Sequence, residues 1–485
     1  MSTQTKQVDV LIVGAGISGI GSAYHLQNQC PNKSYAIIET RSDLGGTWDL
    51  FRYPGIRSDS DMFTFGFNFK PWRSPKAISP GADIKHYIAE AATENAISQH
   101  IVFRHKVIST NWDSKQSKWH TKVQNLQTGE YCQYISRFFF SGAGYYNYEQ
   151  GYTPDFQGTE NFLGKIIHPQ HWPQDLDYAD KKIVVIGSGA TAITLVPAIA
   201  NSASHVTMLQ RSPTYIASLP EQDIFANLMR RLLPAKLAYS LSRWRKILLG
   251  MFMYSLSRRR PEIVKKRIRK AIIDELGEDY PVDKHFKPHY QPWDQRACLV
   301  PDGDFFKAIK NGSASVVTEH IDTFTQTGIK LKNGNEITAD IIVTATGLKL
   351  DILSSYQISI DRNRFNIAES FCYKGMMLSG LPNFAFSMGY TNASWTLKSD
   401  LVSQYVCRLL NHMDKHHHQY CVPVLPADGI KEAPIIDFTS GYIIRALHEM
   451  PKQGREKPWR LNQNYILDRL SLSYSSVVDN SMTFY

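Results

Sequence analysis

Two glycine-rich turns of the same type constrain the fold of this chain more than any other feature. Residues 14–19 read G-x-G-x-x-G, and residues 187–192 read G-x-G-x-x-A. Each motif follows a short apolar run, 8–13 or 183–186, and precedes apolar residues at helical spacing. A strand, a glycine turn and a helix in that order present free N–H groups to a pyrophosphate. The pair predicts an α/β fold with two Rossmann-like dinucleotide-binding domains.

The residue that ends the next apolar strand differs between the two motifs. After the first motif the run 34–38 ends at Glu39, and after the second the run 205–210 is followed by Arg211 and Ser212. A carboxylate at this place accepts hydrogen bonds from ribose hydroxyls, whereas a guanidinium favours the 2′-phosphate of NADP. We therefore predict one FAD site and one NADP(H) site in the same chain. The predicted FAD contacts are Gly14, Gly16, Ser18, Gly19 and Glu39, and the predicted NADP(H) contacts are Gly187, Ser188, Gly189, Ala190, Thr191, Ala192, Arg211 and Ser212.

The second halves of the two modules follow a similar pattern. Residues 119–135 predict a hairpin that leads into a buried strand, and residues 328–332 are expected to turn at Asn333-Gly334 and to return at 341–343. Such a duplication is typical of flavoenzymes that bind two dinucleotides. The predicted organisation is a FAD-binding domain in two parts, 1–148 and 346–485, with an NADP-binding domain at 149–345 that contains a helical insertion at about 220–292.

The positive charge of the chain is concentrated in that insertion. The 485 residues carry a formal net charge of +10, and residues 230–270 hold fourteen Lys and Arg but one acid, Glu262. An apolar stretch, 247–256, lies within the same segment. Two interpretations remain open: a helical insertion with a solvated basic face, and a peripheral contact with an anionic membrane. No nucleic-acid partner is predicted, because no recognition fold accompanies the charge.

Cysteine and histidine spacing bears on redox and metal chemistry. The six cysteines form no C-x-x-C or C-x4-C pair, so neither a redox disulfide nor a metal knuckle is predicted. The histidine run 416–418 is expected to be solvated, and no metal site is predicted. No apolar run reaches 18 residues. We expect a cytoplasmic protein, with peripheral attachment to a membrane as the alternative.

The segment between the two modules carries a further motif. Residues 162–173 read F-x-G-x3-H-x3-W-P, which includes His168 and Trp172. Residues 45–59 fit G-G-x-W-x4-Y-P-G-x3-D, and residues 340–347 fit D-x4-A-T-G. In these motifs and their order, the chain resembles the type I Baeyer–Villiger monooxygenases, a family of class B flavoprotein monooxygenases, over essentially its whole length. It is similar to the bacterial members that activate the thioamide ethionamide.

The resemblance implies a reaction and a set of residues. The implied reaction is FAD- and NADPH-dependent insertion of one oxygen of O2 into a ketone, through a C4a-peroxyflavin, to give an ester or lactone. The catalytic pair would be Arg296, whose guanidinium stays protonated, and Asp59, which would orient it. Gln295 stands where the family often has a Lys, which would weaken the preference for NADPH. Position in the family motifs adds Gly46, Thr47, Trp48, Asp59 and Val107 to the FAD contacts, and Arg57, Ser58 and His168 to the NADP contacts.

Two other functions fit part of the pattern. A flavin N- or S-monooxygenase shares the two nucleotide sites but usually has Tyr or Phe in place of Trp172. A membrane-associated NADPH oxidase or redox sensor would account for the basic segment without substrate turnover. The expected substrate is a small apolar ketone or a sulfur compound, such as a thioether or thioamide, with O2 as the second substrate.

Overall fold

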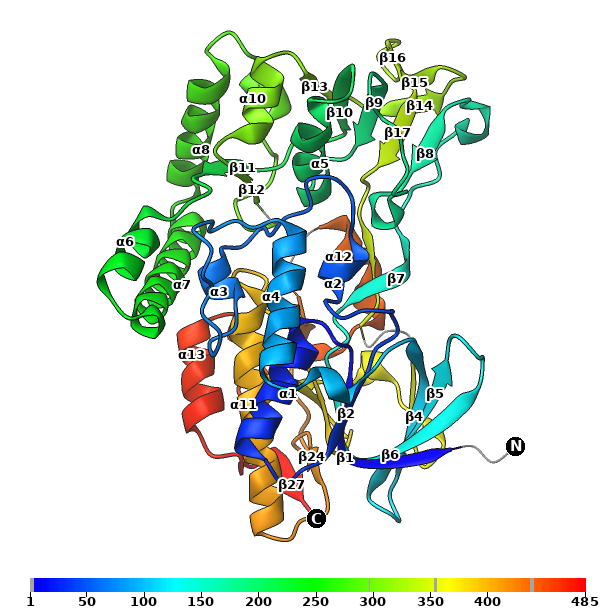
Figure 1. The fold of residues 1–485 in the computed structure, drawn as a ribbon, viewed down its shortest axis with the longest axis vertical. Coiled ribbons are helices and arrows are strands. Elements are labelled where there is room, and N and C mark those ends of the chain that lie inside the picture. Colours follow the sequence, from blue (N-terminus) through cyan, green and yellow to red (C-terminus); the bar gives the residue numbers. More distant parts are fainter. Residues whose placement is uncertain (1–3, 296, 353–355, 437–439) are drawn as a thin grey trace.

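Two β-sheets connected by a pair of extended linkers organise the molecule (Figure 1). The computed structural model describes residues 4–295, 297–352, 356–436 and 440–485. The larger sheet occupies the lower half of Figure 1 and the smaller sheet the upper half. Both chain ends lie beside the larger sheet, so the chain leaves this sheet, builds the smaller one and returns.

The larger sheet is mixed, and its centre is parallel. β1 (Thr5–Val13) lies between β2 (Tyr35–Ile38) and β6 (Tyr131–Ser141) and runs parallel to both. The last four residues of β1 and all of β2 are buried, as expected for a parallel strand covered on both faces. The other strands are β3 (Ile101–Val102), β4 (His105–Asp113), β5 (Lys118–Asn125), β19 (Gln357–Ile360), β20 (Asn363–Arg364) and β23 (Phe384–Phe386), in the order β20-β19-β4-β5-β6-β1-β2-β3 with β23 paired to β6.

Helices from both ends of the chain cover this sheet. α1 (Ile17–Gln29) packs against α11 (Trp395–Lys415), so residues almost 400 positions apart share one hydrophobic core. α4 (Gly81–Glu94) packs beside α1. The shorter helices of this half are α2 (Thr47–Leu50), α3 (Met62–Phe65), α12 (Gly441–Ala446), α13 (Tyr465–Arg469) and the one-turn π-helix η6 (Leu470–Tyr474).

The smaller sheet is entirely parallel and has the order β13-β10-β9-β17-β8. Its strands are short and mostly buried, and α5 (Ala190–Ala200) and α10 (Asp304–Lys310) pack in the same core. A three-stranded antiparallel sheet lies beside it. The strands are β8 (Lys165–Ile167), β9 (Lys182–Ile186), β10 (His205–Gln210), β13 (Ala314–Thr318) and β17 (Ile341–Thr344), then β14 (Ile321–Phe324), β15 (Gly328–Leu331) and β16 (Glu336–Thr338).

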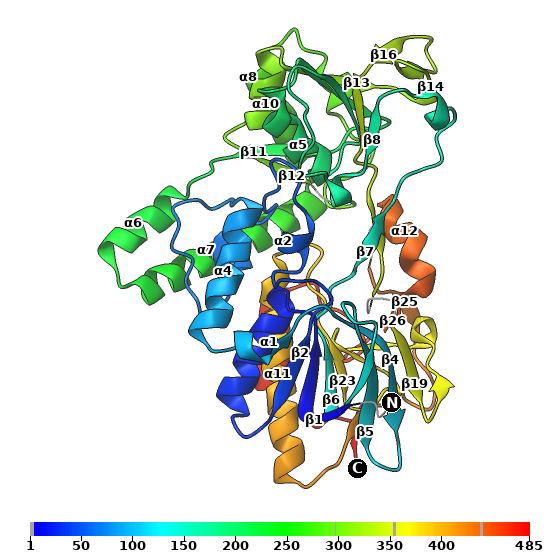
Figure 2. The same ribbon diagram turned by 45° about the vertical axis from the view of Figure 1, so that its right-hand side comes forward.

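A helical segment interrupts the smaller sheet between β10 and β13 and projects to the left in Figures 1 and 2. It is framed by a parallel pair of strands, β11 (Ile216–Leu219) and β12 (Cys298–Pro301). Between them lie α6 (Ile224–Leu232), α7 (Ala235–Arg259), α8 (Pro261–Leu276) and α9 (Val282–His285).

Two linker strands connect the halves. β7 (Tyr146–Gly151) leaves the larger sheet and β18 (Leu348–Leu350) returns to it, and the two pair antiparallel. The remaining strand pairs are β21 (Cys372–Tyr373) with β22 (Met377–Leu378), β24 (Cys421–Pro423) with β27 (Met482–Phe484), and β25 (Glu432–Pro434) with β26 (Lys452–Gly454). Single turns of 3₁₀ helix lie at Ser98–His100, Thr159–Asn161, Pro169–His171, Ile367–Glu369 and Leu447–Glu449.

The predicted fold class, two Rossmann-like dinucleotide-binding domains with a basic helical insertion, is confirmed. One hairpin prediction was wrong in detail. The chain does turn at Asn333-Gly334, but the returning strand is β16, whereas 341–343 belong to the parallel sheet. The strongly apolar run at 341–343 is buried on both faces, which suits a central parallel strand and not a hairpin edge. No helix in the described residues combines the length and apolar character needed to cross a bilayer.

Candidate active site

A cavity of about 340 Å³ is lined by residues of both modules, the one that contains the first glycine turn and the one that contains the second. It begins at the first glycine turn and reaches the start of α5 in the smaller sheet. Because residues from both modules share one wall, two nucleotides bound to them would meet in this space. The predicted site residues that line it are Gly14, Gly16, Ser18, Glu39, Gly46, Thr47, Trp48, Arg57, Ser58, Asp59, Val107, Ala190 and Thr191.

The backbone of the first turn leaves room for a close ligand. Gly14 has φ +93°, a conformation that favours glycine. A Cβ at Gly19 would lie 1.8 Å from the Gly14 carbonyl oxygen, so this glycine lets α1 pack against the turn. A Cβ at Gly16 would meet nothing of the protein closer than 3.5 Å, and Gly16 lies in the cavity wall. Gly16 therefore keeps open a place where a pyrophosphate can approach the helix N-terminus.

Glu39 is buried at the end of β2, beside this turn. One carboxylate oxygen accepts a hydrogen bond from the Ala15 N–H (2.7 Å), and the other accepts one from the Arg41 N–H (2.8 Å). Burial raises the pKa of Glu39, and the two backbone hydrogen bonds offset this only in part. A carboxylate fixed in this way can still accept hydrogen bonds from a ribose, so the residues present fit the adenosine half of FAD.

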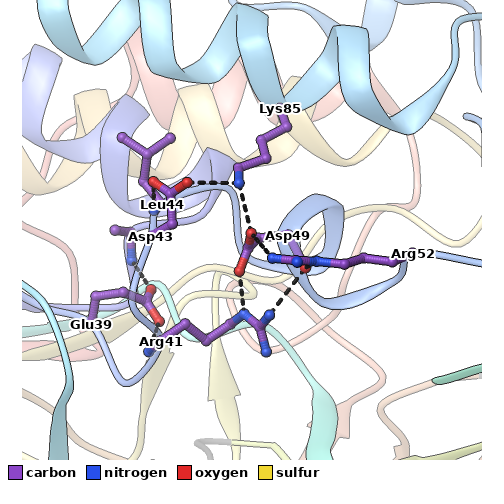
Figure 3. Close-up of polar contacts among 8 residues, drawn as sticks. Glu39, Arg41, Asp43, Leu44, Asp49, Arg52 and Lys85 are labelled. Atoms are coloured by element: carbon purple, nitrogen blue, oxygen red, sulfur yellow. Dashed lines mark hydrogen bonds and ion pairs between the residues drawn. The ribbon is translucent and has the colours of Figure 1, made fainter. Parts of the chain in front are cut away.

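A buried ion cluster holds the loop between Glu39 and the cavity-lining residues 45–48 (Figure 3). The side chain of Asp49 is inaccessible to solvent and accepts hydrogen bonds from Arg41 Nε (2.5 Å), Arg52 Nη2 (2.9 Å) and Lys85 Nζ (2.7 Å). Burial alone would raise the pKa of Asp49, but Lys85 and Arg41 outweigh it, and the pKa lies below the usual value. The cluster fixes the short helix α2, which carries Thr47 and Trp48.

We expect Asp49→Asn to lower the free energy of unfolding at neutral pH by about 1.5–3 kcal/mol, the usual value for a charge-assisted hydrogen bond. Because the pKa of Asp49 is lowered in the folded protein, its contribution is complete above the ordinary aspartate pKa. The contribution is lost as pH falls through the lower folded-state pKa. Thermal unfolding over roughly pH 3–7 should show the difference between wild type and variant shrinking toward acid.

Asp43→Asn is the matched control, since Asp43 binds the same Lys85 (2.7 Å) but is half exposed. Its ion pair should contribute about 0–1 kcal/mol. A constant difference between wild type and Asp49→Asn across this pH range would contradict the assignment.

Aromatic side chains form much of the remaining cavity wall, and of these only Trp48 is among the predicted site residues. Trp395 begins α11, donates a hydrogen bond from Nε1 to Ser18 Oγ (2.8 Å) and stacks on Tyr145 at 5.0 Å between ring centroids. Burial raises the pKa of Tyr53 and of Tyr148, so both phenols stay protonated at neutral pH. The aromatic residues lining the cavity are Trp48, Phe51, Tyr53, Phe65, Tyr145, Tyr146, Tyr148, Tyr356 and Trp395.

The second glycine turn follows the carboxyl end of β9, the central strand of the smaller sheet. Gly187 has φ +138°, and a Cβ there would lie 2.3 Å from the Ala345 carbonyl oxygen. Ser188 Oγ donates a hydrogen bond to the Ser212 carbonyl oxygen (3.0 Å), which joins this turn to the end of β10. Arg211 and Ser212 are exposed there, and Ala192 is buried under the turn. An exposed guanidinium beside a glycine turn fits the 2′-phosphate of NADP.

The segment 57–59 crosses the cavity between the two modules. Arg57 forms an ion pair with Asp304, the first residue of α10, and so links the larger sheet's loop to the smaller sheet. The N–H of Ser58, a buried residue, donates to the Ser79 carbonyl oxygen, and Asp59 lines the cavity. The predicted catalytic Arg296 lies outside the described residues, but Cys298 and Leu299, which follow it closely in the chain, line the same cavity.

His168 lies away from the cavity, where it joins the two linkers. Its Nε2 donates to the Gly347 carbonyl oxygen (3.2 Å), and its Nδ1 accepts from the Gln170 N–H (3.2 Å). A Cβ at Gly151 would overlap the imidazole at 2.0 Å, so the ring is packed directly on β7. Burial lowers the pKa of His168, which keeps it neutral in this tautomer at pH 7. Its contacts fix the relative position of the two linker strands.

Comparisons with known proteins agree with this geometry. The family model described as "Flavin-binding monooxygenase-like" matches residues 75–354, and the one described as "NAD(P)-binding Rossmann-like domain" matches residues 12–74. The FAD-containing monooxygenase EthA of Mycobacterium tuberculosis is 52% identical over 481 residues, covering 99% of this chain and 98% of that protein. EthA of Mycolicibacterium smegmatis is 51% identical over 481 residues, covering 99% and 97%.

Solved structures share the fold. An oxidised steroid monooxygenase bound to NADP aligns with a TM-score of 0.77 at 21% identity, covering 99% of both chains. A cyclohexanone monooxygenase in an open form aligns with a TM-score of 0.77 at 16% identity, covering 100% of both. The predicted cofactors, FAD and NADP(H), are confirmed. The chain belongs to the flavin-binding monooxygenase-like family and is an NADPH-dependent flavin monooxygenase that uses FAD.

Proposed function

We propose that this monooxygenase carries out a Baeyer–Villiger reaction, inserting one oxygen atom of O2 beside the carbonyl of a small apolar ketone to give an ester or lactone. The observation that carries the proposal is the single cavity shared by Glu39, Asp59 and Thr191, with Leu299 in its wall. In this arrangement residues from the two predicted nucleotide sites and an acidic residue line one space, which supports the proposal.

The proposed roles divide between charge and position. Bound FAD, reduced by NADPH, supplies the activation of O2. We propose that Arg296 stabilises the negative charge that develops on the reacting oxygen atoms, since a guanidinium does not deprotonate. We propose that Asp59 orients Arg296, and that Arg57, Ser58 and His168 position the NADP-binding half. Oxygen insertion is favoured where water is excluded, and the aromatic residues in the cavity wall support this role.

The substrate class follows from the cavity's surroundings. A smaller cavity adjoins the main one and shares Tyr145 and Trp395 with it. Its other walls are largely apolar, with Leu350, Met388 and Ile443 among them. An apolar ketone or thioether would bury its hydrocarbon part in such surroundings. Sulfur oxidation at the same site is the second reaction that we propose. The chain resembles bacterial monooxygenases that activate a thioamide, which is a sulfur compound, and the EthA relatives match the whole chain at about half identity.

Product analysis tests this proposal. The FAD-loaded enzyme is incubated with NADPH, O2 and a cyclic or linear ketone, and organic products and hydrogen peroxide are quantified together. Ester or lactone formed in proportion to NADPH consumed is the expected result, with sulfoxide formed from a matched thioether. Sulfoxide without ester would reduce the enzyme to an S-monooxygenase, and peroxide alone would indicate an oxidase. The Arg296→Ala variant should keep FAD and lose ester formation.

We expect Arg211→Ala to weaken the use of NADPH but not of NADH. A charge-assisted hydrogen bond to the 2′-phosphate contributes about 1.5–3 kcal/mol, which corresponds to about a 10- to 150-fold decrease in kcat/KM for NADPH. Steady-state kinetics with both nucleotides measures this. Arg104→Ala, an exposed arginine on the larger sheet's side, is the control. Equal losses with NADPH and NADH would contradict the assignment of Arg211.

A further inference from the structure

Exposed apolar side chains are concentrated on the helical segment. Half of the large hydrophobic residues exposed in the described part of the chain lie between Leu219 and Ile263. Monomeric proteins seldom expose contiguous apolar surface of this kind without a binding role. The segment is also where the chain carries its positive charge.

The exposed side chains follow helical spacing. On α6, Ile224 (82% exposed), Leu228 and Leu232 (65%) recur every four residues and lie on one face. On α7, residues at the same kind of spacing form a second apolar stripe, and α6 packs against α7. The exposed apolar residues of α7 are Leu237, Leu241, Leu248, Leu249, Phe252 (60%) and Met253.

The C-terminal region adds a third apolar element beside these helices. Tyr465 at the start of α13 packs on Trp244 of α7, with 5.8 Å between ring centroids, and the Arg469 guanidinium lies 4.9 Å from the centroid of the same ring. In Figure 1, α13 lies directly below α7. The exposed side chains that follow are Leu467, Leu470 and Tyr474 (67%). The three elements α6, α7 and α13–η6 are called the apolar face below.

The opposite side of α7 is firmly anchored, so the exposed stripe does not come from a loose helix. Arg243 is buried and donates hydrogen bonds to the carbonyl oxygens of Phe63 (2.7 Å) and Gly66 (2.8 Å). Asp223 caps α6 at Ala226 N–H (2.8 Å) and pairs with Lys246 of α7 (2.7 Å). These contacts fix the two helices to each other and to the larger sheet's side, with their apolar residues facing outward.

Exposed cations lie on α6, at both ends of α7 and on α8, which packs against α7. Seven exposed Lys and Arg of the segment pair with no acid among the residues that the structure describes. A surface that combines outward leucines and a phenylalanine with unneutralised cations matches the interface of an anionic bilayer, where apolar groups enter the acyl boundary and cations meet phosphate. Nucleic acid would use the charge but leave the leucines in water. The seven residues are Arg231, Lys236, Arg259, Arg260, Lys266, Arg267 and Lys270.

We propose that the apolar face docks this enzyme on the surface of a membrane that contains anionic phospholipid. The helices lie on the bilayer and do not cross it, in keeping with their length and charge. The docking helix is also close to the active site. Ile247 on the inner side of α7 packs with Tyr390 and Leu397, next to Ala393, which lines the cavity. When the protein is docked, α7 therefore lies between the bilayer, in which apolar compounds dissolve, and the wall of the cavity.

Vesicle flotation tests the proposal independently of the reaction. The FAD-loaded protein is mixed at low salt with vesicles of phosphatidylcholine alone or with phosphatidylglycerol added. We expect it to float with the anionic vesicles. We expect full release only when high salt is combined with substitutions that remove the apolar contacts. Protein that stays at the bottom of the gradient with phosphatidylglycerol vesicles would overturn the proposal.

Two variants assign the binding to this surface. Leu248→Ser/Phe252→Ser should lower the vesicle partition coefficient by about tenfold or more, and Arg231→Glu/Lys236→Glu should remove the dependence on phosphatidylglycerol. Leu126→Ser/Val424→Ser changes exposed apolar residues elsewhere and should bind as wild type. Unchanged flotation of Leu248→Ser/Phe252→Ser would overturn the proposal. So would a wild-type dimer, seen by light scattering, that this variant abolishes, because the face would then bind a second copy.

Discussion

Gly16→Ala is expected to produce a folded protein that cannot retain FAD. A Cβ at Gly16 would lie 3.5 Å from the nearest protein atom, so the chain itself tolerates it. The methyl group would nevertheless occupy the cavity wall where the pyrophosphate approaches the start of α1. Displacing a ligand by about 1 Å can cost about a hundredfold in activity, and here we expect loss of bound flavin. The absorbance of flavin per purified chain and circular dichroism measure the two properties.

Gly19→Ala should fail differently. Its Cβ would lie 1.8 Å from the Gly14 carbonyl oxygen, which is backbone and cannot move away, so α1 would separate from β1. We expect this variant to lose folded structure as well as FAD. Gly250→Ala, on the exposed surface of α7 with no atom within 4 Å of the added Cβ, should resemble wild type. FAD content near that of wild type in Gly16→Ala would contradict the assignment of this turn to FAD.

Asp468→Ala is expected to destabilise the C-terminal region strongly. Asp468 and Lys398 are buried and form an ion pair at 2.8 Å, and Asp468 also accepts hydrogen bonds from Tyr390 (2.8 Å) and Asn462 (2.8 Å). Removing the carboxylate leaves a buried ammonium group without its partner. Breaking such a pair costs about 3–5 kcal/mol. Chemical denaturation of the FAD-loaded protein, followed by flavin and tryptophan fluorescence, measures this loss.

The double variant Lys398→Met/Asp468→Leu provides the matched comparison. In Lys398→Met/Asp468→Leu both charges are gone, and most of the lost stability should return, because apolar groups of similar size replace them. The pair ties α13 to α11, so Asp468→Ala should also make α13 more susceptible to proteolysis. A change in the free energy of unfolding below about 1 kcal/mol would show that the pair is not a structural element.

The sequence predicted the nucleotide modules well because their signals are local. A glycine turn with a strand before it and a helix after it is specified by neighbouring residues, and Glu39 and Arg211 were predicted at the strand ends where the structure places them. The returning strand of the second hairpin was assigned wrongly, since an apolar run of three residues does not reveal its partner. Of the aromatic wall only Trp48 was among the predicted site residues, and Tyr148 and Trp395 were not, because they come from parts of the chain far from it.

By itself, the sequence determined the fold class and the two cofactors, and the assignment of each glycine turn to one nucleotide stays a prediction. These properties depend on residues that are close in the chain. Only the tertiary structure decided which side chains share the cavity, since Ser18 and Trp395 meet there through the packing of α1 on α11. It also decided that α13 extends the apolar face of α6 and α7. Contacts between distant segments depend on how helices pack, and no local pattern encodes them.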